Sequence, residues 1–380
     1  MQKIRVMNVF GTRPEAIKMA PLVNELKKHE EFETMVCVTA QHRQMLDQVL
    51  KIFKIVPDYD LNIMQERQTL AGITTKALNG LCEVFNDAKP DIVLVHGDTT
   101  TTFVGSLAAF YSKVKVGHVE AGLRTYDKYS PFPEEMNRKL TGAMADIHFA
   151  PTISNKQNLL KEGIDEGSIY ITGNTVIDAL KTTVSSSYEF ANETLAGLDY
   201  SKKVILVTAH RRENLGQPLH NICTALLKIV EENPEVELVY PVHLNPAVKE
   251  VAEGILGQHN RIHLIEPLNV QELHNLMDRC YMVMTDSGGL QEEAPALGKP
   301  VLVLRHETER PEAVEAGTVR MAGVETDKIV EMANELIRNQ DEYDKMNKAV
   351  NPYGDGKASQ RIAEAIKYYF GATDVPPTEF

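Results

Sequence analysis

The fold of this chain is best approached from the stretch TDSGGLQEEAPALGKPVLVLRHETERPEAVEAG, residues 285–317. It follows an apolar run at residues 281–284 that is typical of a buried strand. Residues 286–289, with the sequence DSGG, then precede a helix expected at residues 290–297. Small residues between a strand and a helix let backbone N–H groups surround an anion, and the helix N-terminus adds partial positive charge. This pattern predicts a diphosphate-binding loop; the alternative is an ordinary helix start.

Charged side chains of the same stretch suit such a loop. Glu292 and Glu293 fall in the first turn of the expected helix, where their carboxylates could accept hydrogen bonds from sugar hydroxyls. A second strand is expected at residues 300–304, and Arg305 and Arg310 follow it. Their guanidinium groups are expected to contact a second phosphate.

Length and composition restrict the class of protein. A chain of 380 residues is long for one core, so two domains are expected. The net charge of −13 argues against nucleic acid or an anionic membrane as a partner. The first residues show no signal-peptide pattern, and no apolar run has the roughly 20 residues that a membrane helix needs. The four cysteines form no metal-binding pattern. We therefore expect a cytoplasmic protein without a metal or cofactor.

Strands and helices are expected to alternate along the whole chain, which predicts parallel sheets covered by helices on both faces. The strands are expected at residues 4–10, 32–38, 91–95, 114–119, 147–149, 168–171, 204–208, 236–241, 261–265, 282–285 and 300–304. The pattern restarts near residue 173, so we expect an α/β protein with two Rossmann-like, doubly wound domains, 1–172 and 173–365. Residues 366–380 are expected to join the first domain, with 372–380 as a loose tail.

Ligands of open α/β sheets bind at the carboxyl ends of the strands, so residues that follow strands are the functional candidates. In the first domain these are Asp98 and Glu120, with Glu134 at the start of a helix. Three carboxylates so placed suggest general acid–base chemistry. The alternatives are a helix cap for Asp98, an ion pair with Arg124 for Glu120, and an ordinary partner of the helix dipole for Glu134.

Cationic candidates occur in both expected domains. Arg13 and Lys18, after the first strand, could meet a phosphate or a sugar, or could simply be a solvated helix start. In the second domain His210 and Arg211 follow a strand and suit an anion, whereas His243 could equally be a structural histidine. The sequence contains no P-loop, no well-placed GxGxxG, no HExxH and no GxSxG, which disfavours nucleotide triphosphatases, NAD enzymes, zinc proteases and serine hydrolases.

Most of the candidate residues fall within eight blocks: GTRPEAIK at 11–18, TAQHRQML at 39–46, HGDTTTT at 96–102, HVEAGLRT at 118–125, PEEMNR at 133–138, TAHRREN at 208–214, PVHLNP at 241–246 and DSGGLQEEAP at 286–295. Taken together, these blocks resemble the non-hydrolysing UDP-N-acetylglucosamine 2-epimerases of bacteria. The resemblance covers nearly the whole chain. It implies the GT-B architecture, in which two Rossmann-like domains face a central cleft, and a homodimer. It also implies the reversible interconversion of UDP-N-acetylglucosamine and UDP-N-acetylmannosamine for cell-envelope polysaccharide.

The resemblance also implies roles for individual residues. The implied catalytic residues are Asp98, Glu120, Glu134 and His210. The implied UDP-sugar-binding residues are Arg13, Lys18, Asp98, Glu120, His210, Ser287, Gly288, Gly289, Glu293 and Arg310. A second UDP-N-acetylglucosamine, bound as an activator, would contact Gln41, Gln44, Arg67, Glu134, Arg211 and His243. Some relatives carry an aromatic residue near the uracil where this chain has Leu273.

Chemistry explains why such an enzyme needs these groups. The C2 proton of the sugar is not acidic, because no carbonyl adjoins it. Loss of UDP from C1 gives C1 cationic character and acidifies C2–H, and loss of that proton leaves a 2-acetamidoglucal. The reaction needs carboxylates around the ring and cationic or N–H groups at the leaving diphosphate. Which carboxylate is acid and which is base stays open. The alternatives are a glycosyltransferase of the same fold, a hydrolysing 2-epimerase and a nucleotide-sugar sensor without activity.

Overall fold

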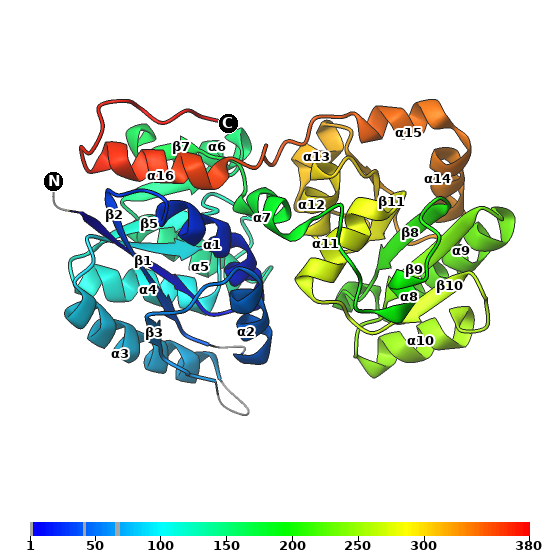
Figure 1. Ribbon diagram of the computed structural model, residues 1–380, viewed down its shortest axis with the longest axis horizontal. Helices are drawn as coiled ribbons and strands as arrows, with labels where there is room; N and C mark the ends of the chain where they lie inside the picture. Colours follow the sequence, from blue (N-terminus) through cyan, green and yellow to red (C-terminus); the bar gives the residue numbers. More distant parts are fainter. Residues whose placement is uncertain (1–2, 41–42, 65–68) are drawn as a thin grey trace. The chain divides into compact units, whose positions relative to one another are not determined.

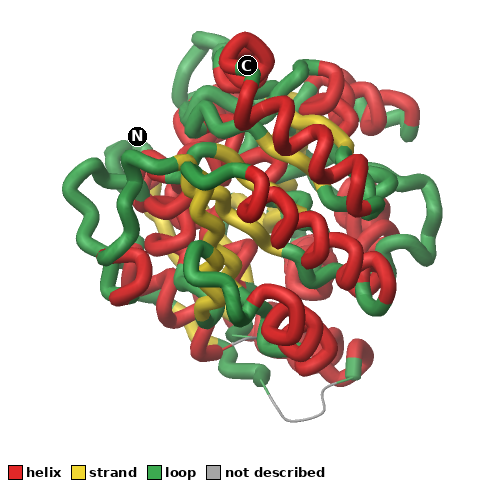
Figure 2. Tube along the Cα trace, turned by 90° about the vertical axis from the view of Figure 1, so that its right-hand side faces the viewer, coloured by secondary structure: helices red, strands yellow, loops and turns green. Residues whose placement is uncertain are grey.

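The computed structural model describes residues 3–40, 43–64 and 69–380, with the side chain of Gln44 excepted. These residues divide into two compact units, one made of Met1–Thr182 and Tyr353–Phe380 and the other of Thr183–Pro352. Strands and helices alternate through both units (Figure 1; strands are yellow and helices red in Figure 2). The α/β class and the two-domain organisation expected from the sequence are confirmed.

The first unit holds, over its described residues, a seven-stranded sheet with the order β3-β2-β1-β4-β5-β6-β7. All of its strand pairs are parallel. Its strands are β1 Ile4–Phe10, β2 Phe32–Val38, β3 Tyr59–Asp60, β4 Ile92–His96, β5 Lys115–Val119, β6 Ile147–Ala150 and β7 Ile169–Ile171. Its helices are α1 Arg13–Leu26, α2 Arg43–Ile52, α3 Leu70–Ala88, α4 Thr100–Tyr111, α5 Glu134–Met144, α6 Ile153–Lys161, α7 Thr175–Thr183 and α16 Ala358–Tyr369, with a short 3-10 turn at Glu166–Ser168.

The second unit holds, over its described residues, a six-stranded parallel sheet with the order β10-β9-β8-β11-β12-β13. Its strands are β8 Lys203–Thr208, β9 Val236–Pro241, β10 Ile262–Ile265, β11 Met282–Thr285, β12 Val301–Val303 and β13 Val319–Met321. Its helices are α8 Glu193–Ala196, α9 Gln217–Glu232, α10 Pro246–Leu256, α11 Val270–Arg279, α12 Leu290–Ala296, α13 Pro311–Glu315, α14 Thr326–Arg338 and α15 Gln340–Asn347, with a 3-10 turn at Arg212–Asn214.

Both faces of the first sheet are buried, which explains its nearly continuous apolar strands. In β1, Val6 and Phe10 belong to the core beneath α1, α2 and α16, whereas Met7 and Val9 belong to the core beneath α3 and α4. The eleven strands expected from the sequence are all present, with each end within one residue of its expected place. The edge strands β3 and β13 were not anticipated, because two and three residues are too short to show a pattern.

The division into units falls after Thr182 and before Tyr353, whereas the sequence suggested residues 172 and 366. Helix α7 accounts for the first difference, because it packs with the start of α16 inside the first unit. Asp178 of α7 accepts hydrogen bonds from the backbone N–H groups of Ala358 and Ser359, at 3.2 and 2.8 Å. Helix α16 lies beside α1 (Figure 1), so the whole helix belongs to this unit.

Residues 372–380 are not the loose tail expected from the sequence. The backbone N–H of Phe380 donates to the carbonyl oxygen of Ile171 in β7 at 2.9 Å, and the guanidinium of Arg361 lies 5.5 Å from the Phe380 ring centroid. Strand β7 is an edge strand with free backbone groups on one side, which explains why an extended tail can pair with it.

Each sheet has one topological switch point, on either side of which the connections lead to opposite edges of the sheet. It lies between β1 and β4 in the first unit and between β8 and β11 in the second. Loops at the carboxyl ends of two such strands diverge and leave a crevice, which is where open α/β sheets bind ligands. The candidate residues are therefore sought at these two places.

Candidate functional sites at the two switch points

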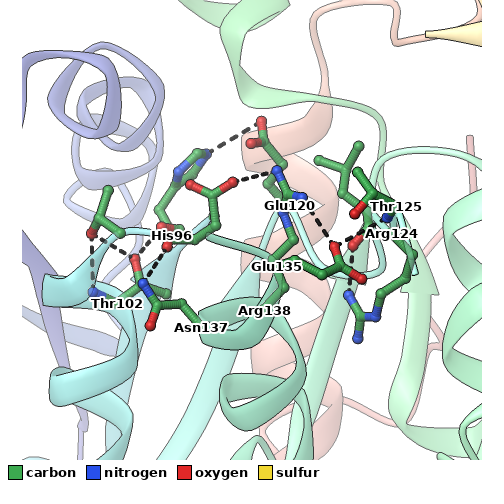
Figure 3. Close-up of polar contacts among 12 residues, drawn as sticks. His96, Thr102, Glu120, Arg124, Thr125, Glu135, Asn137 and Arg138 are labelled. Carbon is green, nitrogen blue, oxygen red and sulfur yellow. Dashed lines mark hydrogen bonds and ion pairs between the residues drawn. The ribbon is translucent and has the colours of Figure 1, made fainter. Parts of the chain in front are cut away.

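In the first unit, Glu120 lies in a buried polar cluster just beyond β5. Its carboxylate is paired with the ammonium of Lys18 from α1, and Asn174 Nδ2 donates to Oε2 at 2.8 Å. The ring of His96, at the end of β4, points toward the same oxygen, with Nε2 3.6 Å away (Figure 3). Glu120 has a φ of 61°, a left-handed conformation that is uncommon for a residue with a side chain. The cluster therefore holds the Glu120 carboxylate in a fixed position.

His96 is neutral in this cluster. Burial lowers its pKa to about 4, although the Glu120 carboxylate acts in the opposite direction. A neutral imidazole can accept a proton or donate a hydrogen bond without adding charge. Sequence reasoning did not single out His96, but its place at the end of a strand was a usable signal.

Asp98 lies at the same switch point, beyond the turn at Gly97. A Cβ at Gly97 would fall 3.5 Å from Glu120 Oε1, so the two carboxylates belong to neighbouring loops. Asp98 Oδ2 accepts from Arg138 Nη2 at 2.5 Å, and its backbone carbonyl accepts from the Asn137 side chain (Figure 3). Capping of α4 is performed by Thr99, not by Asp98, because Thr99 Oγ1 accepts from the Thr102 N–H.

Glu134 and Glu135, the two acidic residues at the start of α5, have different surroundings. Glu134 is the first residue of the helix and is half-buried. Glu135 is fully buried and accepts hydrogen bonds from the backbone N–H groups of Thr125 and Tyr126, both at 3.0 Å (Figure 3). Glu135 is therefore committed to holding the preceding loop, which leaves Glu134 as the carboxylate available for chemistry.

The alternative in which Arg124 forms an ion pair with Glu120 is wrong. Arg124 makes a bidentate pair with Glu162, at 2.9 and 2.7 Å. Gly122 turns the chain between the two residues with a φ of 91°, and a Cβ there would fall 2.3 Å from the Asn155 carbonyl oxygen. This turn directs Arg124 toward the end of α6, so that Glu120 forms its ion pair with Lys18 instead.

Glu15 joins the two loops at this switch point and was not anticipated. Its Oε2 accepts from the N–H groups of Gly11 and Thr12, at 3.1 and 2.8 Å, and its Oε1 accepts from the hydroxyls of Thr99 and Thr102, at 2.7 and 3.3 Å. Burial raises the pKa of Glu15, while these hydrogen bonds act to lower it. The signal was available in the sequence, since Thr12-x-x-Glu15 is a capping box. Arg13 lies half-buried between them at the first position of α1.

In the second unit, Asp286 joins the loops that follow β8 and β11. Its carboxylate is fully buried, and Oδ2 accepts from the backbone N–H groups of His210 and Arg211, both at 2.7 Å, and from Asn214 Nδ2 at 3.0 Å. The next N–H, that of Ser287, donates to Thr285 Oγ1 at 2.9 Å, so it is already occupied in this structure.

Two guanidinium groups border the glycine loop. A Cβ on Gly288 would fall 3.7 Å from Arg310 Cζ and 3.8 Å from Arg211 Nη2. Arg310 is held by the buried carboxylate of Glu292. Space in front of a glycine, flanked by two cations, is what a phosphate group needs. The strand–loop–helix arrangement predicted from the sequence is therefore present, and Arg211, which the family resemblance assigned to the activator, borders it together with Arg310.

One other prediction about this loop needs correction, and two stay predictions. Arg305 is buried against Glu309 and Glu213, at 2.8 and 2.6 Å, and does not contact the loop. Glu292 is the partner of Arg310, and Glu293 receives a hydrogen bond from His274 at 3.1 Å. Both glutamates were expected to accept hydrogen bonds from sugar hydroxyls, and this stays a prediction, because a carboxylate can accept more than one hydrogen bond.

His210 lies at the edge of this loop with 41% of its side chain exposed. Its ring stacks on that of His243, with centroids 5.1 Å apart and planes 1° from parallel. Burial lowers the pKa of His210, against the opposing effect of Asp286. His243 Nδ1 accepts from the Asn245 N–H at 3.1 Å, which places the His243 proton on Nε2.

The structure gives less information on the remaining residues predicted to bind the activator or the uracil. Gln41 and Arg67 lie outside the described residues, as does the side chain of Gln44. Leu273, expected near a uracil, is a half-buried residue of α11 next to His274. Within the described residues, no helix combines the length and the apolar character that crossing a membrane requires.

Comparisons with known proteins agree with this arrangement. The family model for UDP-N-acetylglucosamine 2-epimerase matches residues 24–367. A Bacillus subtilis protein named UDP-N-acetylglucosamine 2-epimerase is 60% identical over 380 residues, which cover 100% of this chain and 99% of that protein. Staphylococcus aureus MnaA, solved in a co-structure with UDP, gives a TM-score of 0.91 at 53% identity and covers 99% of this chain and 100% of its own. The Neisseria meningitidis UDP-GlcNAc 2-epimerase, solved bound to UDP-GlcNAc, gives a TM-score of 0.88 at 51% identity over 96% of this chain and 99% of its own. The chain belongs to the UDP-N-acetylglucosamine 2-epimerase family.

Proposed function

We propose that this protein interconverts UDP-N-acetylglucosamine and UDP-N-acetylmannosamine by epimerisation at C2, without net hydrolysis. Family membership supports the reaction, and the relatives solved with UDP and with UDP-GlcNAc support the nucleotide sugar as its substrate. The observation that carries the proposal is the division of charge between the switch points. Carboxylates gather at one, and two guanidinium groups with a glycine gather at the other.

The proposed mechanism begins with loss of UDP. The guanidinium groups of Arg211 and Arg310 stabilise the negative charge that develops on the diphosphate as the C1–O bond breaks. The electron pair of that bond leaves with UDP, and C1 gains cationic character. A carboxylate of the first unit then removes the C2 proton and leaves a 2-acetamidoglucal.

Reversal of these steps completes the reaction. A proton is delivered to the opposite face of C2, and the diphosphate oxygen adds again at C1. Glu120 is one proton carrier, because Lys18 and Asn174 hold its carboxylate in place. Asp98 and Glu134 are the other candidates. His210, whose backbone N–H donates to Asp286 just before the glycine loop, is the candidate to act on the diphosphate. UDP has to stay bound throughout, which requires that water be kept from the glycal.

One experiment separates this proposal from its alternatives. The purified protein is incubated with UDP-N-acetylglucosamine in heavy water, and NMR follows deuterium at C2 together with free UDP. Epimerisation predicts deuterium at C2 of both UDP-sugars with little free UDP. Accumulation of UDP with free N-acetylmannosamine would indicate a hydrolysing epimerase, and retention of hydrogen at C2 would contradict an epimerase altogether. Retained hydrogen with transfer to an added acceptor would indicate a glycosyltransferase.

The proposal extends to regulation and setting. A second UDP-N-acetylglucosamine as activator, a homodimer, a cytoplasmic location and a supply of precursor for cell-envelope polysaccharide are its further parts. Activation predicts that the rate of the reverse reaction, from UDP-N-acetylmannosamine, rises when a small amount of UDP-N-acetylglucosamine is added. An unchanged initial rate would remove the activator from the proposal.

A further inference from the structure

Asp286 uses only one of its two carboxylate oxygens to join the loops after β8 and β11. Oδ2 accepts from the N–H groups of His210 and Arg211 and from Asn214. Oδ1 is also buried, yet it forms no hydrogen bond within the part of the chain that the structure describes. A buried carboxylate oxygen without a donor is costly, so a nearby N–H is expected to serve it.

The nearest candidate donor is the imidazole of His210, whose Nδ1 lies 3.7 Å from Oδ1. That separation is slightly too long for a hydrogen bond, and a small rotation of the ring would close it. Hydrogen bonds of catalytic groups often shorten when the substrate binds. The backbone N–H of His210 already donates to Oδ2 of Asp286, so the backbone from which the ring extends is fixed.

The neighbouring histidine limits how the His210 ring can turn. The two rings are parallel with their centroids 5.1 Å apart, so the His243 ring restricts rotation of the His210 ring on one of its faces. Since the N–H of Asn245 occupies His243 Nδ1, that ring offers His210 no competing acceptor at Nδ1. Asp286 Oδ1 is therefore the acceptor that geometry leaves for His210 Nδ1–H.

We propose that Asp286 is a positioning residue, which accepts a hydrogen bond from Nδ1–H of His210 and so presents Nε2 of that ring to the nucleotide sugar. The tautomer assignment depends only on the geometry of the second unit. The consequence for catalysis rests on the function proposed above. A merely structural role would join the two loops through Oδ2 and leave the tautomer of His210 undetermined.

The test uses the full chain with ¹⁵N-labelled histidine at about pH 8, where the depressed pKa of His210 keeps the ring neutral. Long-range ¹H–¹⁵N NMR distinguishes a protonated from an unprotonated ring nitrogen, and the His210→Asn variant identifies the signal. The wild-type protein is expected to carry the proton on Nδ1. A wild-type ring protonated on Nε2 would overturn the proposal, and this measurement needs no variant of Asp286.

Asp286→Asn sharpens the test. The amide oxygen can take the place of Oδ2, and the amide NH₂ then faces His210 Nδ1, which must become an acceptor. The proton is therefore expected to move to Nε2, with a fall in kcat of about 10²-fold, the lower range for a lost proton-transfer group, and little change in KM. An unchanged tautomer in the folded variant would overturn the proposal.

Asn214→Ala is the matched control, because it removes a donor to Oδ2 without touching Oδ1. The His210 proton is expected to stay on Nδ1 in this variant; a shift to Nε2 would show that loop geometry alone sets the tautomer, against the proposal. The His210→Asn variant separates the two levels of argument. If it turns over like wild type while the tautomer behaves as expected, the role of Asp286 stands and the role of His210 in the proposed function fails.

Discussion

Each unit joins the two loops of its switch point with one buried carboxylate, but the two carboxylates are used differently. Both carboxylate oxygens of Glu15, in the first unit, accept hydrogen bonds from neighbouring loops. Oε2 accepts from Gly11 and Thr12, and Oε1 accepts from Thr99 and Thr102. Asp286 in the second unit keeps one oxygen without a hydrogen bond among the described residues, beside His210. The comparison teaches that a buried acid at a strand end is structural when its acceptor capacity is filled, and becomes a candidate for function when it is not.

The charges around these carboxylates also differ. In the first unit, Glu120 is paired with Lys18 and Asp98 with Arg138, so the ions are already neutralised in pairs. In the second unit, Arg310 is also paired, with Glu292, but its guanidinium group and that of Arg211 both approach the space in front of Gly288. The first arrangement suits proton transfer with fixed partners, and the second suits an incoming polyanion.

The largest expected effect on activity is that of replacing Glu120, a carboxylate that does not join two loops. Glu120→Gln is expected to lower kcat by about 10²-fold or more, because a positioned acid or base contributes on that scale. Steady-state kinetics with UDP-N-acetylglucosamine measures it, and UDP affinity should change much less. Glu166→Gln, an exposed carboxylate of the same unit, is the control. Wild-type turnover of Glu120→Gln would remove Glu120 from the candidate proton carriers.

A smaller effect is expected from filling the space in front of the glycine. Gly288→Ala adds a methyl group that the folded protein can accommodate, since its nearest neighbours are 3.7 and 3.8 Å away. The same methyl group would meet a bound phosphate, so the Kd for UDP is expected to rise about ten-fold, within the roughly 1–3 kcal/mol cost of overpacking. Isothermal titration calorimetry measures it. Gly254→Ala, where an added Cβ meets nothing within 4 Å, should bind UDP as wild type does. Equal affinity of both variants would remove the phosphate from this loop.

The smallest effect concerns Glu15 and depends on pH. Burial raises its pKa above the ordinary value of 4.5, so above that pH the folded chain holds more protons at Glu15 than the unfolded chain. The contribution of Glu15 to stability is therefore full below about 4.5 and decreases as pH rises through the folded pKa. Glu15→Gln cannot titrate and is expected to cost about 1 kcal/mol at low pH, the usual net value of a hydrogen bond, and less at high pH. Hydrogen exchange of peptides from residues 4–26 at pH 5 and pH 8 measures this; a deficit that grows with pH would contradict it.

The strands and the location of the sites could be predicted from the sequence, for physical reasons. Each buried parallel strand is a continuous apolar run, and the residue after it must lie at the ligand-binding edge. That is how Asp98, Glu120, His210 and the DSGG loop were found. Membership of the epimerase family, inferred from motifs, is confirmed by the comparisons.

The pairing of charged residues could not be predicted in the same way. Arg124 selects Glu162 rather than Glu120, and Arg305 selects Glu213 and Glu309, because turns and packing decide which side chains meet. The same holds for Glu15 and Asp286. In the sequence, each resembles an ordinary helix-capping or loop residue. Only the hydrogen-bond partners of each carboxylate oxygen distinguish the structural role of Glu15 from the candidate functional role of Asp286.

The way the chain leaves and re-enters the first unit has a practical consequence. The N–H of Asn174 donates to the carbonyl of Tyr353 at 2.6 Å, and Lys181 reaches the carbonyl of Gly356 at 2.7 Å, so the two ends of the gap in this unit are neighbours. Residues 183–352 thus have the topology of a domain inserted into the first unit. A short glycine–serine bridge from Thr182 to Tyr353 should give an independently folding half-protein, and the excised piece could be exchanged for that of a relative to make chimaeras.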